Sequence, residues 1–306
     1  MAHDHHHDHH HHDAPEIGSR AFAIGIVLNT LFVVVEASAG LWSGSLALLA
    51  DAGHNLSDVA ALGIAWGAAY LGQRPPSARR TYGLARLTVL AALANAVLLL
   101  IAVGAIAIEA FQELSAGSGS VRGGTVMAVA GLGILVNGAT TLLFVRDRHR
   151  DLNIEAAFQH MAADTAVSLG VVISGAIILL TGKMWIDPLV SLGVAALIAW
   201  GSWRLLRASM NLAVDGVPDA VDHAAVRAFL TGAPGVSEIH DLHIWPLSTT
   251  KVALTVHLVR PGAALDDAFL GSLTHDLEHR FGISHATIQI EAGGSHACPL
   301  KPDHIV

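Results

Sequence analysis

Six long apolar stretches constrain the fold of this chain more than any other feature of its sequence. They cover residues 21–42, 46–71, 87–113, 123–145, 154–181 and 187–206. A helix needs roughly 20 apolar residues to cross the hydrocarbon core of a bilayer. The composition agrees, since 53% of the residues are hydrophobic and only 14% are charged, whereas about a quarter are charged in soluble domains. The sequence therefore predicts an all-α membrane bundle of six transmembrane helices over residues 20–208.

Basic residues predict how these helices are oriented. Arginines follow the second, fourth and sixth stretches, at positions 74, 79, 80, 86, 146, 148, 150, 204 and 207, whereas the opposite side carries only Arg122 and Lys183. Loops rich in Lys and Arg stay in the cytoplasm, so both termini are expected there. No cleavable signal peptide is expected, because the N-terminus is polar. With short loops and no sorting signal, the chain is expected in a bacterial inner (plasma) membrane.

Two of the apolar stretches contain ionisable residues at matching spacings. His54 and Asp58 lie four residues apart in the second, and His160 and Asp164 in the fifth. Residues at this spacing project from one face of a helix. Ionisable groups inside a membrane are costly and usually functional, and imidazole with carboxylate suits Zn²⁺ or another divalent first-row metal. We therefore predict one metal site built from these four residues.

Other interpretations of these charges remain open. A proton relay would use the same groups without a metal. An intramembrane hydrolase is disfavoured, because the chain lacks the His-Glu-x-x-His spacing of metalloproteases and shows no Ser or Cys nucleophile in a recognisable partner motif. An enzyme is therefore not expected. Asp51 could support the metal ligands, carry protons or face a cavity, and Glu36 could exchange protons or form a structural pair.

The chain changes character after residue 208. Helical periodicity in 222–236 and 266–282 and strand patterns in 236–247, 250–259 and 286–292 give the order αββαβ. This order predicts a small cytoplasmic α+β domain, ferredoxin- or metallochaperone-like, over 209–292, followed by a tail at 293–306.

Several potential metal ligands gather on or after these strands. They are His240, His257, His285, Glu291, His296 and Cys298. We expect a second metal site here, the alternative being a dimer domain with scattered surface histidines. Cys298 is the only cysteine, so no disulfide can form within the chain.

Residues 1–19 begin with MAHDHHHDHHHHD, a His-rich segment that we expect to be disordered. An affinity tag is one interpretation, but the interrupting aspartates favour a native metal-collecting segment. The formal net charge of −8 and the absence of a basic stripe argue against a nucleic-acid partner.

Several motifs together resemble those of one family. They are HNLSD in the second stretch, HMAAD in the fifth, RRTYGLARLTVLAALANA before and into the third, and HDLHIWPLS and HATIQIE in the C-terminal part. Over residues 20–292 the chain resembles the cation diffusion facilitator family, in its zinc-transporting branch. The resemblance implies a homodimeric antiporter in the lipid bilayer that exports Zn²⁺ from the cytoplasm in exchange for H⁺ by alternating access. It places the ion on His54, Asp58, His160 and Asp164, and a His at position 54 implies a preference for Zn²⁺ over Cd²⁺.

The resemblance also implies that the C-terminal domain dimerises and binds regulatory zinc, with His240 and His257 at family ligand positions. The next family position holds Ser284, one residue before His285, which is a departure from the pattern. The segment GQRPPSARRTYG has neither acids nor histidines, so a further site that some members carry there is not expected. Two alternatives stay open: an exporter of Co²⁺, Ni²⁺ or Fe²⁺ on the same scaffold, and a membrane metal sensor that does not transport.

Overall fold

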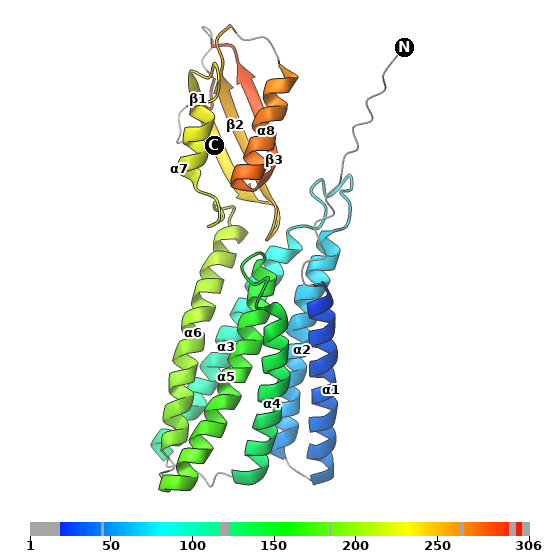
Figure 1. Ribbon diagram of the computed structural model, residues 1–306, viewed down its shortest axis with the longest axis vertical. Coiled ribbons are helices and arrows are strands. Elements are labelled where there is room, and N and C mark those ends of the chain that lie inside the picture. Colours follow the sequence, from blue (N-terminus) through cyan, green and yellow to red (C-terminus); the bar gives the residue numbers. More distant parts are fainter. Residues whose placement is uncertain are drawn as a thin grey trace.

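The computed structural model describes residues 19–43, 46–116, 123–183, 185–262, 266–293 and 298–301. Six long helices run side by side and lead into a separate C-terminal domain (Figure 1). The helices are α1 (Ser19–Ser43), α2 (Leu46–Gly72), α3 (Leu87–Ala116), α4 (Gly123–Phe144), α5 (Leu152–Thr181) and α6 (Ile186–Ala213). This arrangement confirms the predicted fold class. Helix α6 continues through position 208, where the sequence suggested a domain boundary.

The outside of the helix bundle is apolar, as expected for a protein in lipid, and its mostly apolar interior also contains buried polar side chains. Large apolar side chains point outward along its helices, among them Leu31, Ile101, Leu180 and Trp200, while Asn29, Glu36, Asn95 and Asn137 are buried. Among the described residues, Arg20–Ser38, Leu87–Ser115 and Pro188–Ala213 are long and apolar enough to cross a membrane. Shorter apolar helical stretches occur at Asp58–Gly72 and Ala130–Phe144.

Helix packing groups the bundle into pairs. Helix α3 packs most extensively against α6, α4 against α5, and α1 against α2. Small residues allow the close approach that association in lipid requires: Ala92 and Ala96 of α3 are fully buried. The connections from α2 to α3 and from α4 to α5, which hold seven of the 14 arginines, lie at the end of the bundle that carries the C-terminal domain (Figure 1).

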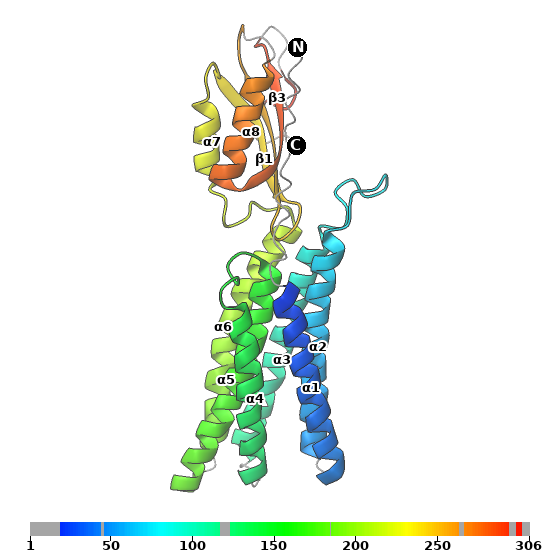
Figure 2. The same ribbon diagram turned by 45° about the vertical axis from the view of Figure 1, so that its right-hand side comes forward.

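The C-terminal domain consists of α7 (His223–Thr231), β1 (Glu238–Pro246), β2 (Val252–Val259), α8 (Asp267–Phe281) and β3 (Ile283–Glu291), which is the predicted αββαβ order. The sheet order is β1-β2-β3, with β2 antiparallel to β1 and parallel to β3. Both helices cover the same face of the sheet (Figure 2). Their apolar residues, including Val226, Leu230, Leu273 and Leu277, form the core with the strands.

Polar caps define where several helices begin. Asp222 and Asp266 accept hydrogen bonds from the first-turn N–H groups of α7 and α8, and Asp151 does so for α5. Such caps satisfy N–H groups that have no partner within the helix. Helices α5 and α8 end at Gly182 and Gly282, whose positive φ of 68° and 71° favours glycine.

Candidate metal centres

The first candidate centre lies between α2 and α5 inside the helix bundle. On α5, Met161 packs against residues of α1, α2 and α4, while Ala163 packs into a cluster formed with α3 and α6. The helix face between these two residues carries His160 and Asp164. This face points toward Asp58 of α2. Asp58 is only 2% exposed and His160 9%.

The ligand atoms of Asp58, His160 and Asp164 all lie within 4.8 Å of one another. His160 Nε2 is 2.6 Å from Asp58 Oδ1 and 3.9 Å from Asp164 Oδ2. Two ligand atoms on one tetrahedral zinc ion are about 3.3 Å apart, given metal–ligand distances of roughly 2.0–2.1 Å. Small side-chain adjustments would therefore bring all three groups onto a single ion. Nitrogen and carboxylate oxygen donors of this kind suit divalent first-row metals.

The remaining residues predicted for this part of the bundle are only partly described. His54 is in α2, one turn before Asp58, but its side chain and that of Asp51 lie outside the described residues. Asn55, which the sequence analysis did not single out, donates a hydrogen bond of 2.8 Å from Nδ2 to Glu36 Oε2. Both residues are buried, so Glu36 forms a polar contact between α1 and α2, three residues before Asp58 on α2.

The second candidate centre lies at one end of the sheet in the C-terminal domain. It contains His240, His257, Glu291 and Cys298, whose ligand atoms lie within 4.8 Å of one another. His240 and His257 are direct partners in the β1–β2 register. Glu291 Oε1 is 3.3 Å from His240 Nε2 and 3.2 Å from His257 Nδ1, and Cys298 Sγ is 3.6 Å from His257 Nδ1. Two imidazoles, a carboxylate and a thiol match the donor set of a four-coordinate zinc site.

Asp241 supports this centre from the side, and the sequence analysis missed it. The register of β1 shifts between His240 and His243, and Asp241 adopts a positive φ of 50°. This bulge turns its carboxylate toward His257 Nε2, at 3.4 Å, and His243 Nε2, at 2.9 Å. A carboxylate on the far nitrogen of a histidine ligand fixes the orientation of the ring. Its place within HDLH was a signal, but nothing in the sequence predicted the bulge.

The electrostatics of the second centre keep Glu291 ionised. Partial burial acts to raise the pKa of this carboxyl, but hydrogen bonds with Cys298 and Gln289 and the nearby His240 and His257 together lower the pKa below its ordinary value. A metal would therefore meet a carboxylate rather than a carboxylic acid at neutral pH.

Two of the predicted C-terminal ligands are not part of this described cluster. His285 is exposed and lies in β3 beside Ala253, six residues before Glu291, or about 20 Å along a strand. Its ring stacks edge-on against Tyr82, with centroids 5.7 Å apart. The structure thus keeps His285 apart from the cluster. His296 lies outside the described residues.

A six-helix membrane bundle contains one buried cluster of potential metal ligands, and the attached α+β domain contains a second. This combination is typical of membrane proteins that handle divalent metal ions. Comparisons with known proteins agree. Residues 22–212 match the family model of the cation efflux transmembrane domain, and residues 218–293 match that of the cation efflux protein cytoplasmic domain.

Relatives match over nearly the whole chain. The metal cation efflux system protein CzcD of Cupriavidus metallidurans is 35% identical over 281 residues, covering 92% of this chain and 89% of CzcD. The zinc transporter ZitB of Escherichia coli is 37% identical over 299 residues, covering 97% and 94%. A solved structure of the metal-bound C-terminal domain of CzcD is 43% identical and covers 23% of this chain and 99% of its own, with a TM-score of 0.22.

This chain belongs to the cation efflux, or cation diffusion facilitator, family. It is a divalent metal cation efflux transporter of the membrane rather than an enzyme, as the motifs predicted. The second family match also agrees with a C-terminal domain on the cytoplasmic side.

Proposed function

We propose that the chain exports Zn²⁺ from the cytoplasm in exchange for H⁺, and that Asp58, His160 and Asp164, together with His54, bind the transported ion. The observation that supports this most is the convergence of three buried ligand atoms from α2 and α5 within 4.8 Å. Burying an imidazole beside two carboxylates inside a membrane bundle costs free energy, and ionisable groups kept in such a place usually serve a function. Zinc is favoured because the relative ZitB is described as a zinc transporter.

Proton coupling follows from the chemistry of these ligands. Zinc binds neutral imidazole and ionised carboxylate, so the metal and the proton compete for the same lone pairs. On the side where protons are plentiful, protonation of His54, His160 or an aspartate would help to release the ion. Alternating exposure of one site to the two sides would then link zinc export to proton entry.

The same proposal covers orientation and assembly. We propose that the chain lies in a bacterial inner membrane with both termini in the cytoplasm. The arginine-rich connections support this orientation, because they lie at the end of the bundle that carries the C-terminal domain. A homodimer is supported by the match of residues 218–293 to the cytoplasmic domain of the family. We propose His240, His257, Glu291 and Cys298 as ligands of a resident zinc ion in that domain, with a regulatory or structural role.

The transport site can be tested by removing its carboxylates one at a time. Asp58→Ala and Asp164→Ala should each abolish zinc flux in proteoliposomes with an imposed proton gradient, because each removes a charged ligand from a three- or four-ligand site. Asp267→Ala provides the matched control, since it makes the same change at an exposed position of α8. Normal flux in both site variants would refute the assignment of the site.

Another metal on the same scaffold is the main competing function, because the affinity order of a nitrogen and oxygen site does not by itself select zinc. Competition of Co²⁺, Ni²⁺, Fe²⁺ and Cd²⁺ against zinc flux separates these cases. A metal sensor predicts binding without flux in the same vesicles.

A further inference from the structure

The turn between β1 and β2 reaches from the C-terminal domain onto the helix bundle. It comprises Leu247–Lys251 and is held by internal hydrogen bonds: the Ser248 hydroxyl accepts hydrogen bonds from the N–H groups of Thr250 and Lys251, at 3.1 and 2.9 Å. The Lys251 carbonyl accepts one from the Leu247 N–H at 2.8 Å. A turn held in this way presents Thr249 at its tip in a fixed orientation.

Thr249 contacts two helices of the bundle at once. Its backbone N–H donates to Thr88 Oγ1 in the first turn of α3, at 3.1 Å, and its hydroxyl donates to Asp151 Oδ2, at 3.0 Å. The other oxygen of the same carboxylate, Asp151 Oδ1, accepts from the Asn153 N–H at 2.6 Å and caps α5. The Asn153 amide also reaches Thr249 Oγ1, at 3.5 Å. Thr88 and Asn153 are both buried, so these hydrogen bonds are largely shielded from solvent.

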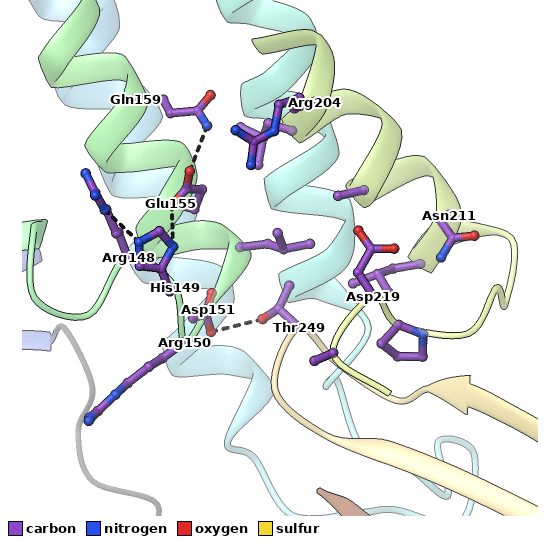
Figure 3. A pocket seen from close by; sticks show the side chains of 16 residues that line it. Arg148, His149, Arg150, Asp151, Glu155, Gln159, Arg204, Asn211, Asp219 and Thr249 are labelled. Atoms are coloured by element: carbon purple, nitrogen blue, oxygen red, sulfur yellow. Dashed lines mark hydrogen bonds and ion pairs between the residues drawn. The ribbon is translucent and has the colours of Figure 1, made fainter. Parts of the chain in front are cut away.

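This contact connects two helices that pack against different neighbours in the bundle. Helix α3 belongs with α6 and helix α5 with α4 in the packing of the bundle, and Thr249 joins the first turn of α3 to the first turn of α5. A cavity of about 370 Å³ lies beside it, lined by Asp151 at the start of α5, Glu155 and Gln159 of α5, Arg204 of α6 and Thr249 itself (Figure 3). Residue 151 is nine residues before His160, or roughly 14 Å along the helix.

We propose that Thr249 is a positioning residue for transport: from the C-terminal domain, it fastens α3 to α5 and so fixes the helix that carries His160 and Asp164. The inference rests on the proposed function of those two residues. Loss of the hydroxyl removes the hydrogen bond donated to Asp151 and the longer one accepted from Asn153, while leaving the volume of the side chain intact. A net hydrogen bond corresponds to about a fivefold change in a two-state population. The apparent affinity for the transported ion would weaken by up to the same factor, because less of the protein holds the binding-competent arrangement.

Thr249→Val and Thr249→Ser form a matched pair, since valine keeps the shape of threonine and serine keeps its hydroxyl. Thr250→Val is a second control, because it removes a hydroxyl one residue away that contacts only Ser248 among the described residues, at 3.3 Å. Thr88→Val and Thr88→Ser test the other partner, and they replace the Thr249 pair if Thr249→Val does not give a monodisperse protein.

The position of the domain can be measured by pulsed electron resonance between two spin labels. Arg146→Cys, after α4, and Glu278→Cys, on α8, are both exposed, and Cys298→Ser removes the only native cysteine. Labelled chain is diluted in an excess of unlabelled chain, so that only distances within one chain contribute. Thr249→Val should add or enlarge a second distance population by about fivefold, while Thr249→Ser and Thr250→Val retain the parent distribution. Equal distributions in the Val and Ser variants, or equal shifts in both, would overturn the proposal.

Transport supplies the second readout, in chains that retain Cys298 and carry no labels. Thr249→Val should raise the KM for zinc by up to about fivefold, with a smaller effect on the maximal rate, and Thr249→Ser should restore it. An unchanged KM in Thr249→Val would also contradict the proposal. If the unaltered chain moves no zinc, the proposed function fails, but the distance measurement still decides whether the Thr249 hydroxyl holds the C-terminal domain in place on the bundle.

Discussion

His257 shows how much a single residue can organise in the C-terminal domain. Its Nδ1 faces Glu291 and Cys298, and its Nε2 faces Asp241. The first nitrogen is therefore the one available to a metal, and the second is oriented by a carboxylate, which is the usual arrangement at zinc-binding histidines. His240, which is 2% exposed, approaches the same Glu291 oxygen from β1. The centre thus depends on two adjacent strands as well as on the end of β3.

The lowered pKa of Glu291 leads to a prediction about pH. A carboxyl whose folded-state pKa is lowered contributes stability above its unfolded-state pKa, near 4.3, and loses it as the pH falls through the lower folded value. Between pH 5.5 and 8, its charge is therefore constant, and Glu291 itself adds nothing to the pH dependence of zinc affinity. Glu291→Gln should lower the affinity about tenfold or more at every pH in this range without changing the slope.

The measurement is a competition titration against a zinc-chelating indicator, with Asp58→Ala and Asp164→Ala present so that the bundle does not contribute. Glu278→Gln, an exposed carboxylate on α8, serves as the control and should leave the affinity unchanged. A slope that becomes shallower in Glu291→Gln would mean that this carboxyl titrates near neutrality, contrary to its environment.

At the residue scale, the sequence could predict candidate ligands that share a helix face but not those brought together by irregular backbone. Asp58, His160 and Asp164 follow from four-residue spacing, since a regular helix fixes which residues are neighbours. Asp241 depends on a bulge, and His285 was expected among the ligands because it lies beside a predicted strand and one residue after a family ligand position. Its distance from Glu291 along β3 depends on register and on where the strand ends, neither of which its residue type reveals.

At the scale of elements, α8 contains two glycines whose substitution should have opposite effects. Gly271 lies inside the helix, and an added Cβ there would meet no atom within 4 Å. Gly282 ends the helix at a φ of 71°, also with open space around it. Gly271→Ala should therefore stabilise α8 by about 0.5–1 kcal/mol. Gly282→Ala should destabilise it by about 1 kcal/mol, because alanine disfavours positive φ.

Hydrogen exchange of the α8 amides in the full chain measures both effects, since the two domains need not unfold together. Protection should increase in Gly271→Ala and decrease in Gly282→Ala. A decrease in both would indicate that Gly271 is needed for packing in the assembled protein rather than being a neutral surface position.

Elements were the scale at which the sequence was most informative. Apolar length predicted the six helices of the bundle, and the change to alternating patterns predicted αββαβ. Helix ends were less predictable: α3 extends to Ala116 and α6 to Ala213, beyond their apolar stretches, because amphipathic turns can continue a helix into water.

At the scale of the whole molecule, contacts between the two domains could not be predicted. Arg86, before α3, forms an ion pair with Asp215, after α6, and Thr249 reaches Thr88 and Asp151. These partners are separated by 129, 161 and 98 residues, and each contact depends on how two folded units meet. No local spacing or periodicity in the sequence predicts contacts of this kind. Each partner looks like an ordinary polar residue when the sequence is considered alone.

Proton-coupled zinc export can be measured as zinc accumulation under an imposed pH difference. Proteoliposomes containing the unaltered chain and an internal zinc indicator are given an acidic interior. For chains whose C-terminal domain lies outside the vesicle, this interior corresponds to the outer side of the cell membrane. Accumulation of zinc above the external concentration is predicted, with collapse when an ionophore dissipates the pH difference. Zinc entry that stays the same with and without the pH difference, or no entry at all, would contradict the account.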